Sequence, residues 1–200
     1  ASKTWTRIGL VSNGYIVVGG GTSADINFAN QILPNPLQPN NVLAPYWTDL
    51  NPAAGGAMRL ATLTDNVSTW LIAEWDAVPA YGTGRPNSFQ VWMRLGTVED
   101  ITFTYGPVNN GDGGFLTVGA ENRFGNSGQN YYADGAGSLP ANGAELRVTS
   151  IPGAPGETRV ITYQATGVKK GVWSNCGILC SPNVFQGDNI ACFIGQVTGR

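Results

Sequence analysis

The amino-acid sequence predicts an all-β fold, an antiparallel β-sandwich or jelly-roll-like domain with at most one short helix. Apolar and polar residues alternate through several segments, which is the period of a strand with one buried face. Asn-Gly and Asp-Gly pairs separate these segments and suit the tight turns of β-hairpins. No long helical pattern stands between the expected strands, so a parallel architecture of strands and crossover helices is excluded.

The first third of the chain contains the one predicted helix. Ser23 is a candidate N-cap, the helix extends to Ile32, and the prolines at 34, 36 and 39 end it. Further on, the segment from Thr69 to Val78 is apolar on both faces, which is typical of a central strand covered on each side. Glu74 and Asp76 stand out within it, and their spacing places them on the same side of the strand.

The later strands are predicted from strict alternation. Their inward-facing sets are Phe89, Val91, Met93 and Leu95, then Ile101, Phe103 and Tyr105, then Leu146 and Val148, and finally Ile161, Tyr163 and Ala165. The predicted turns are Asn13-Gly14, Asn110-Gly111, Asp112-Gly113, Asp134-Gly135 and Asn142-Gly143. Short strands at this spacing favour a sandwich.

The 200 residues are expected to form a single β-sandwich accessory domain over residues 1–200. Residues 1–151 form its main part. A linker-like break at Pro152-Gly-Ala-Pro-Gly156 precedes residues 152–200, whose strands carry the cysteines. These strands either complete the same sandwich or begin a following module, and a segment this short makes a weak independent core, which favours the first alternative.

The three cysteines, Cys176, Cys180 and Cys192, all lie near the C-terminus. Their spacing does not match a zinc site, and the chain has no histidine to complete one. We therefore expect one disulfide that holds the C-terminal strands and one unpaired cysteine, with the pairing left open. Three reduced, buried cysteines are the alternative.

Composition excludes several classes of partner. Charged residues make up 12% of the chain and the formal net charge is -2, so the clustered basic residues of a nucleic-acid-binding protein are missing. No apolar run approaches the roughly 18 residues of a membrane span. We expect no nucleic-acid partner and no membrane span.

The chain contains no histidine, so it cannot form a catalytic triad that depends on an imidazole. Glu74 and Asp76 are the remaining catalytic candidates, because glycosidases use two carboxylates about 5 to 9 Å apart. The alternative is that Glu74 accepts hydrogen bonds from neighbouring strands or pairs with an arginine such as Arg94. We predict that the chain has no catalytic residues and is not an enzyme.

Binding residues are sought among loop aromatics and turn carboxylates. Tyr46, Trp47, Tyr131 and Tyr132 are the candidate ligand-binding residues, since aromatic side chains on loops recognise ligands at low entropic cost. The alternative is that they fill the core at strand ends. Asp49-Leu-Asn51 and the turn from Asn109 to Gly113 offer oxygen ligands for Ca²⁺, but such turns also form without ions, so no metal or other cofactor is predicted.

A series of motifs in this order resembles two related kinds of module. The motifs are Ser12-Asn-Gly-Tyr-Ile16, Asn40-Asn-Val-Leu-Ala-Pro-Tyr-Trp-Thr-Asp-Leu-Asn51, Ile72-Ala-Glu-Trp75, Phe89-Gln-Val91, Ile101-Thr-Phe-Thr-Tyr105 and Val118-Gly-Ala-Glu-Asn122. One module is the accessory domain that follows the catalytic domain of secreted bacterial subtilisin-like proteases, and the other is the nidogen-like extracellular domain. The resemblance implies a β-sandwich, an extracellular location and a non-catalytic role, and it transfers no catalytic residue. The segment from Cys176 to Cys192 has no counterpart in it.

Three functions follow as hypotheses. The first is an accessory domain that binds protein substrate for a parent protease, or stabilises and regulates that protease through its catalytic domain. The second is an adhesion module that binds a glycan or a matrix protein. The third is a hydrolase that uses Glu74 and Asp76.

Overall fold

The computed structural model describes residues 4–150, 171–178 and 190–197. The chain forms two compact units, Ala1–Ser150 and Ile151–Arg200, and each is described by itself. No helix in these described ranges is long and apolar enough to cross a membrane.

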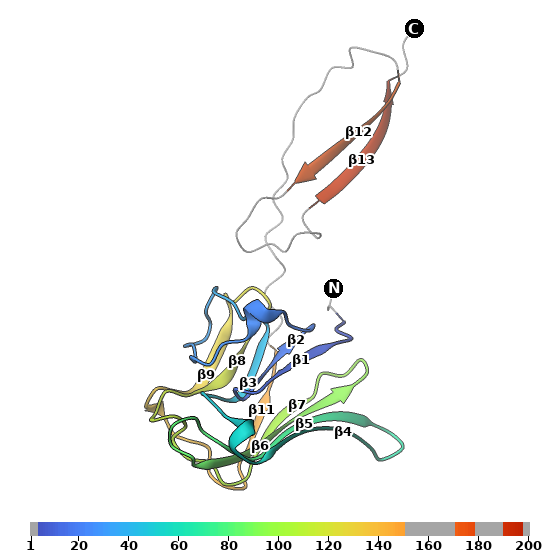
Figure 1. The fold of residues 1–200 in the computed structure, drawn as a ribbon. Coiled ribbons are helices and arrows are strands. Elements are labelled where there is room, and N and C mark those ends of the chain that lie inside the picture. Colours follow the sequence, from blue (N-terminus) through green and yellow to red (C-terminus); the bar gives the residue numbers. More distant parts are fainter. Residues whose placement is uncertain (1–3, 151–170, 179–189, 198–200) are drawn as a thin grey trace. The chain divides into compact units, whose positions relative to one another are not determined.

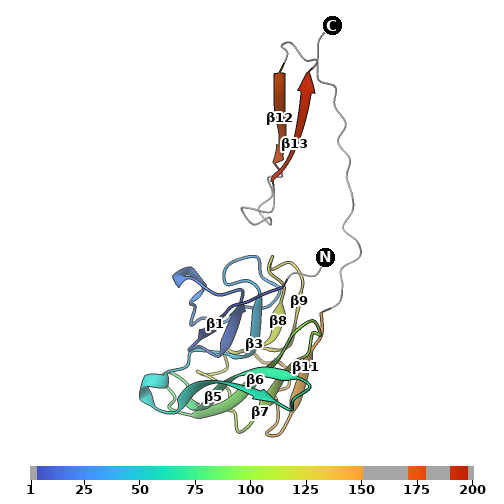
Figure 2. The same ribbon diagram turned by 90° about the vertical axis from the view of Figure 1, so that its right-hand side faces the viewer.

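The first unit consists of two antiparallel sheets that lie as two layers (Figures 1 and 2), which confirms the predicted fold class. The six-stranded sheet has the order β1 (Ile8–Val11), β2 (Tyr15–Val18), β3 (Val42–Trp47), β8 (Thr117–Glu121), β9 (Gly128–Ala133) and β10 (Ala136–Gly137). The five-stranded sheet has the order β11 (Glu145–Val148), β7 (Ile101–Tyr105), β6 (Pro86–Leu95), β5 (Thr69–Pro79) and β4 (Ala57–Thr64).

The predicted turns have the backbone geometry that their glycines allow. The glycine of each of the five turns has a positive φ. In the β1–β2 hairpin Gly14 has φ 78°, and a Cβ at this position would collide with the carbonyl oxygen of Tyr46. Gly14 is therefore required both by its conformation and by the close approach of β3.

The core fills the space between the sheets. Trp75 stacks on Phe89 with ring centroids 4.9 Å apart, and Tyr46 of the opposite sheet packs against Phe89 at 5.2 Å. Burying each of these side chains contributes about 1.5–3 kcal/mol. The alternating pattern of β6 is confirmed through Met93, while Leu95 at the end of the strand is 49% exposed.

A second apolar cluster lies on the other face of the six-stranded sheet and includes Tyr15, Leu33 and Trp47. The predicted helix from Ser23 to Ile32 was wrong, because only a single 3₁₀ turn forms, η1 (Ser23–Asp25). Its N-cap is Thr22, which forms a capping box with Asp25.

Side chains of the sheet explain why η1 does not continue as a helix. The Tyr15 hydroxyl donates to the carbonyl of Asp25 at 2.6 Å and accepts from the N–H of Asn27 at 2.8 Å. The Trp47 indole N–H donates to the carbonyl of Asn27 at 3.2 Å. These bonds take up backbone groups that a helix would have paired internally. Burial raises the pKa of Tyr15 to about 12, which keeps its hydroxyl a proton donor. A second 3₁₀ turn, η2 (Pro52–Ala54), precedes β4.

Strand β5 differs from the sequence prediction on one face. It lies between β4 and β6, as a central strand should, and Ala73 and Trp75 are fully buried against the core. On the opposite face the side chains of Glu74 and Asp76 are 28% and 49% exposed. In the part of the chain that the structure describes, no second layer covers this face. The apolar residues of this face are Trp70 and Ile72. Ile72 lies opposite Ala61 of β4 and Trp92 of β6 and is 6% exposed.

The second unit contains β12 (Gly171–Ile178) and β13 (Ile190–Val197), which pair with each other in an antiparallel sheet of their own. The register places Cys176 opposite Cys192. Cys180, the break at residues 152–156 and the predicted strand with Ile161, Tyr163 and Ala165 lie outside the described residues.

Candidate functional site

The outer face of the five-stranded sheet carries a row of polar side chains. The register places Arg59 of β4 opposite Glu74 of β5, Glu74 opposite Gln90 of β6, and Gln90 opposite Thr104 of β7. Directly opposed residues on one face of a sheet lie within reach of each other. Four strands therefore contribute one polar side chain each to a continuous line across the sheet.

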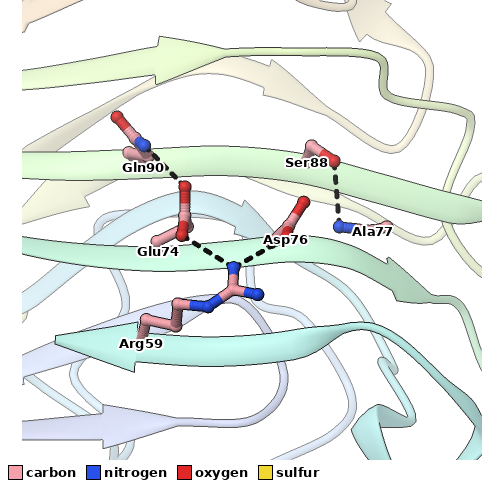
Figure 3. A network of polar contacts seen from close by, with 6 residues as sticks. All are labelled: Arg59, Glu74, Asp76, Ala77, Ser88 and Gln90. Carbon is pink, nitrogen blue, oxygen red and sulfur yellow. Dashed lines mark hydrogen bonds and ion pairs between the residues drawn. The ribbon is translucent and has the colours of Figure 1, made fainter.

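One guanidinium binds both candidate catalytic carboxylates (Figure 3). Nη1 of Arg59 lies 3.0 Å from Oε2 of Glu74 and 2.7 Å from Oδ2 of Asp76. Hydrogen bonds with Asp76 and Glu74 raise the pKa of Arg59 above its ordinary value. The two carboxylates point to one side of β5, as their spacing predicted. The suggested partner Arg94 was wrong, because the register places Arg94 opposite Trp70 and Arg59 opposite Glu74.

This arrangement does not match a pair of catalytic carboxylates. A glycosidase acid needs a site that holds its proton near neutral pH, usually by burial. Here the side chains of Arg59 and Asp76 are 54% and 49% exposed, and a cation lies between the two acids. Because water screens charges at an exposed surface, ion pairs of this kind contribute little to the stability of a fold. The trio links the outer surfaces of β4 and β5.

The polar row continues into an aromatic side chain. Gln90 donates from Nε2 to Oε1 of Glu74 at 2.7 Å, and its Oε1 accepts from the indole N–H of Trp92 at 2.7 Å. Thr104 donates to the same oxygen at 3.3 Å. A hollow of about 250 Å³ lies beside this network and is lined by Glu74, Trp75, Ser88, Phe89, Gln90, Thr104, Tyr105 and Gly106.

Ser88 supports a bulge next to this hollow. Its Oγ accepts from the N–H of Ala77 at 2.9 Å (Figure 3). Ala77 has φ 52°, and the β5–β6 register shifts between Trp75 and Val78. The bulge bends β5 at its end and leaves Asp76 within reach of Arg59.

The four candidate recognition aromatics are not gathered at one site. Tyr46 and Trp47 are fully buried and Tyr132 is 8% exposed, so these three rings belong to the apolar clusters. Tyr131 is 47% exposed and presents its ring to solvent. A second hollow of about 250 Å³ is lined by Gly113, Gly114, Phe115, Tyr132, Asp134 and Gly135. Sequence reasoning did not single out Phe115, which is 64% exposed there.

The two turns that offered oxygen ligands meet in the fold. Burial raises the pKa of Asp49, and the charge of Asp112 raises it further. The hydroxyl of Thr48 donates to the carbonyl of Phe115 at 2.7 Å and accepts from the N–H of Asp112 at 3.2 Å. Among the described residues no group of three or more acidic, cysteine or histidine side chains gathers as a metal site would require. Hydrogen bonds within the protein thus account for the shape of the second turn.

Glu121 is an ionisable residue that the sequence reasoning missed. Its side chain on β8 is 7% exposed. Oε2 accepts from the N–H of Asn35 at 2.8 Å, whereas Oε1 is buried without a hydrogen-bond partner. Desolvation raises the pKa of Glu121 to about 7. The sequence offered one sign of this burial: Glu121 lies two residues after Gly119 and four after Thr117, so the three share one face of β8. Residues 31–35 cover that face.

Comparisons with known proteins define the family. No curated protein and no solved structure matches the chain. The model of one family, described as NIDO related, matches residues 1–165. This match includes the whole two-sheet unit, and it agrees with the nidogen-like part of the resemblance. The chain belongs to the NIDO-related family.

Proposed function

We propose that this protein is a non-catalytic binding module that serves as an accessory domain of a secreted bacterial protease. It holds protein substrate near the parent active site or stabilises the parent enzyme. NIDO-related domains are extracellular accessory modules, which supports the general assignment. The observation that carries the non-catalytic part is the shared Arg59 guanidinium, which occupies both Glu74 and Asp76 on an open surface. The link to a protease is supported by the motif series alone.

The experiment measures binding and protease activity separately. The full chain is incubated with heat-coagulated casein and with insoluble elastin, and bound protein is quantified after washing. We expect saturable binding without release of soluble peptides. In parallel, the activity of the parent protease on the same solids is compared with that of a parent lacking residues 1–165. No binding, together with unchanged parent activity, would contradict the proposal.

The exposed ring of Tyr131 favours a second candidate function, adhesion through a glycan. An aromatic ring that is accessible beside hydrogen-bonding groups can stack on a sugar while polar neighbours fix its orientation. A glycan array tests this with Tyr131→Ala, and Tyr81→Ala is the matched control because Tyr81 is also exposed, at 62%. Selective loss of a signal in the Tyr131 variant would favour adhesion over substrate binding.

The hydrolase alternative is tested at the two carboxylates of β5. Glu74→Gln and Asp76→Asn keep the size of each side chain but remove the charges that Arg59 binds. We expect both variants to leave any hydrolysis measured with the purified chain unchanged. A loss of a hundredfold or more in one variant, at unchanged stability, would restore the catalytic reading.

A further inference from the structure

Strand β4 is an open edge of the five-stranded sheet. In the described part of the chain it pairs with β5 on one side only (Figure 1). It is 8 residues long, whereas the edge strands β1, β11 and β10 have 4, 4 and 2 residues. Proteins usually protect such an edge with charges, proline or a covering segment. Within residues 4–150, the edge of β4 has none of these protections, since no further strand pairs with it, it contains no proline and its single charge, Arg59, is bound by carboxylates of β5.

The hydrogen-bond register identifies the backbone groups at this edge. The N–H of Asp65 donates to the carbonyl of Ser68 at 3.2 Å, which makes this a bonded pair at the end of the β4–β5 hairpin. Bonded and non-bonded pairs alternate along an antiparallel ladder. The N–H and C=O groups of residues 59, 61 and 63 therefore pair with β5, and those of Met58, Leu60 and Thr62 face the open edge.

A hydrogen bond between two other strands of the sheet leads to the same assignment of bonded and outward-facing residues in β4. The N–H of Arg94 donates to the carbonyl of Asp100 at 2.9 Å between β6 and β7. Bonded and non-bonded pairs alternate along each ladder, and a residue of β6 or β5 that bonds to the strand on one side does not bond to the strand on the other. Following this rule from Arg94 through β6 and β5 shows again that residues 59, 61 and 63 bond to β5. Two independent starting points thus assign the same outward-facing groups.

The side chains at this edge are apolar or carry hydroxyl groups. Leu60 and Leu63 are 54% and 51% exposed, one on each face of β4, and Ala61 and Thr62 lie between them. An alternating series of amide donors and carbonyl acceptors matches another polypeptide backbone in extended form. The flanking leucines favour aliphatic side chains on that partner, and no charge at the edge selects for an acidic or basic one.

We infer that the open edge of β4 binds an extended, uncharged segment of a partner polypeptide, which adds to the sheet as a further strand. The inference rests on the proposed binding of protein substrate and names its site and its recognition chemistry. An unfolded or loosely folded protein substrate would supply such a segment, whereas a tightly folded surface would not. Backbone pairing makes the binding broad in sequence, with preference set by the side chains beside Leu60 and Leu63.

The probe is a synthetic capped peptide in which threonine and valine alternate between two terminal lysines. Its control is the same peptide with alternate amides N-methylated, which removes the donors on one edge. Binding to the full chain is measured by titration, and amide hydrogen exchange is followed by NMR. We expect the peptide to slow exchange at Leu60 and Thr62, while the amides of residues 59, 61 and 63 are protected before it is added.

Thr62→Pro tests the edge directly, because proline removes an outward N–H and is tolerated in edge strands at solvent-facing positions. Thr62→Ala is the matched control, since it shortens the side chain but keeps the N–H. We expect at least a tenfold loss of peptide affinity in the proline variant and less than a threefold change in the alanine variant. Leu60→Lys is a second variant that keeps every backbone group and should weaken binding by placing a charge at the edge.

The outcomes separate this inference from the proposed function. Binding of coagulated casein that Thr62→Pro leaves unchanged would overturn the edge inference and leave the binding function intact. Failure of the wild-type chain to bind any protein solid would contradict the function itself. A concentration-dependent dimer that protects Leu60 and Thr62 without peptide would make a second copy the occupant, and it would overturn the inference as well.

Discussion

Replacement of Glu121 by glutamine should change how the stability of the protein depends on pH. The pKa of this carboxyl group is raised from 4.5 to about 7 by burial. Because the folded protein holds the proton more tightly than the unfolded chain, the stabilisation is fully present below pH 4.5 and is lost as pH rises through 7. At about 1.4 kcal/mol for each pH unit of difference, the wild-type protein should lose about 3 kcal/mol of unfolding free energy over this range.

The Glu121→Gln variant cannot ionise and keeps an oxygen that accepts from the N–H of Asn35. Its unfolding free energy should therefore fall much less between pH 4.5 and 8. Urea unfolding at several pH values measures this difference, and the carbon-13 shift of the Glu121 carboxyl group gives its titration midpoint directly. Glu145→Gln is the control, because it makes the same change from carboxyl to amide at an exposed position.

Two results would refute this reasoning. One is a titration midpoint for Glu121 near 4.5, which would mean that the carboxylate is solvated in the folded protein. The other is a parallel loss of stability with pH in the wild-type and glutamine proteins, which would assign the pH dependence to other groups. The first result would also contradict the burial of the unpaired Oε1 of Glu121.

Two further predictions concern the turns and the cysteines. Gly14→Ala should destabilise the protein by more than about 3 kcal/mol, because the added Cβ meets a backbone carbonyl. Gly82→Ala should cost only about 1–2 kcal/mol, because Gly82 has a similar φ of 74° but open space around it. Equal losses of urea midpoint in the two variants would contradict the steric argument. Cys176 and Cys192 should form the disulfide, since directly opposed residues have Cα atoms about 4.5–5.5 Å apart, within disulfide range. Peptide mapping without reduction should then find Cys180 as the free thiol, and a bridge that includes Cys180 would contradict the register argument.

Local pattern predicted most of the five-stranded sheet. The alternation through Phe89, Val91 and Met93 is set by burial of one face, and that information is present in the sequence itself. The helix prediction at Ser23 failed because Tyr15 of β2 and Trp47 of β3 form hydrogen bonds with the backbone at the end of η1 and just after it. Tertiary hydrogen bonds of this kind outweigh a local capping signal.

The contacts of the candidate site could likewise be predicted only in part from local sequence. The shared direction of Glu74 and Asp76 follows from strand period alone, but their partner Arg59 depends on which strand pairs with β5 and in which register. Tyr46 and Trp47 were open to two readings because their neighbours in sequence do not show that a second layer covers each face of β3. Burial of Glu121 depends on a segment more than eighty residues earlier in the chain.

The most direct test of the central claim measures binding and hydrolysis in one sample. The purified full chain is titrated onto heat-coagulated casein, and bound protein and released peptides are quantified at each point. A non-catalytic binding module gives saturable binding with no released peptides, and Glu74→Gln leaves both readouts unchanged. Peptide release that disappears in the Glu74→Gln variant, or no binding by the wild-type chain, would contradict the account.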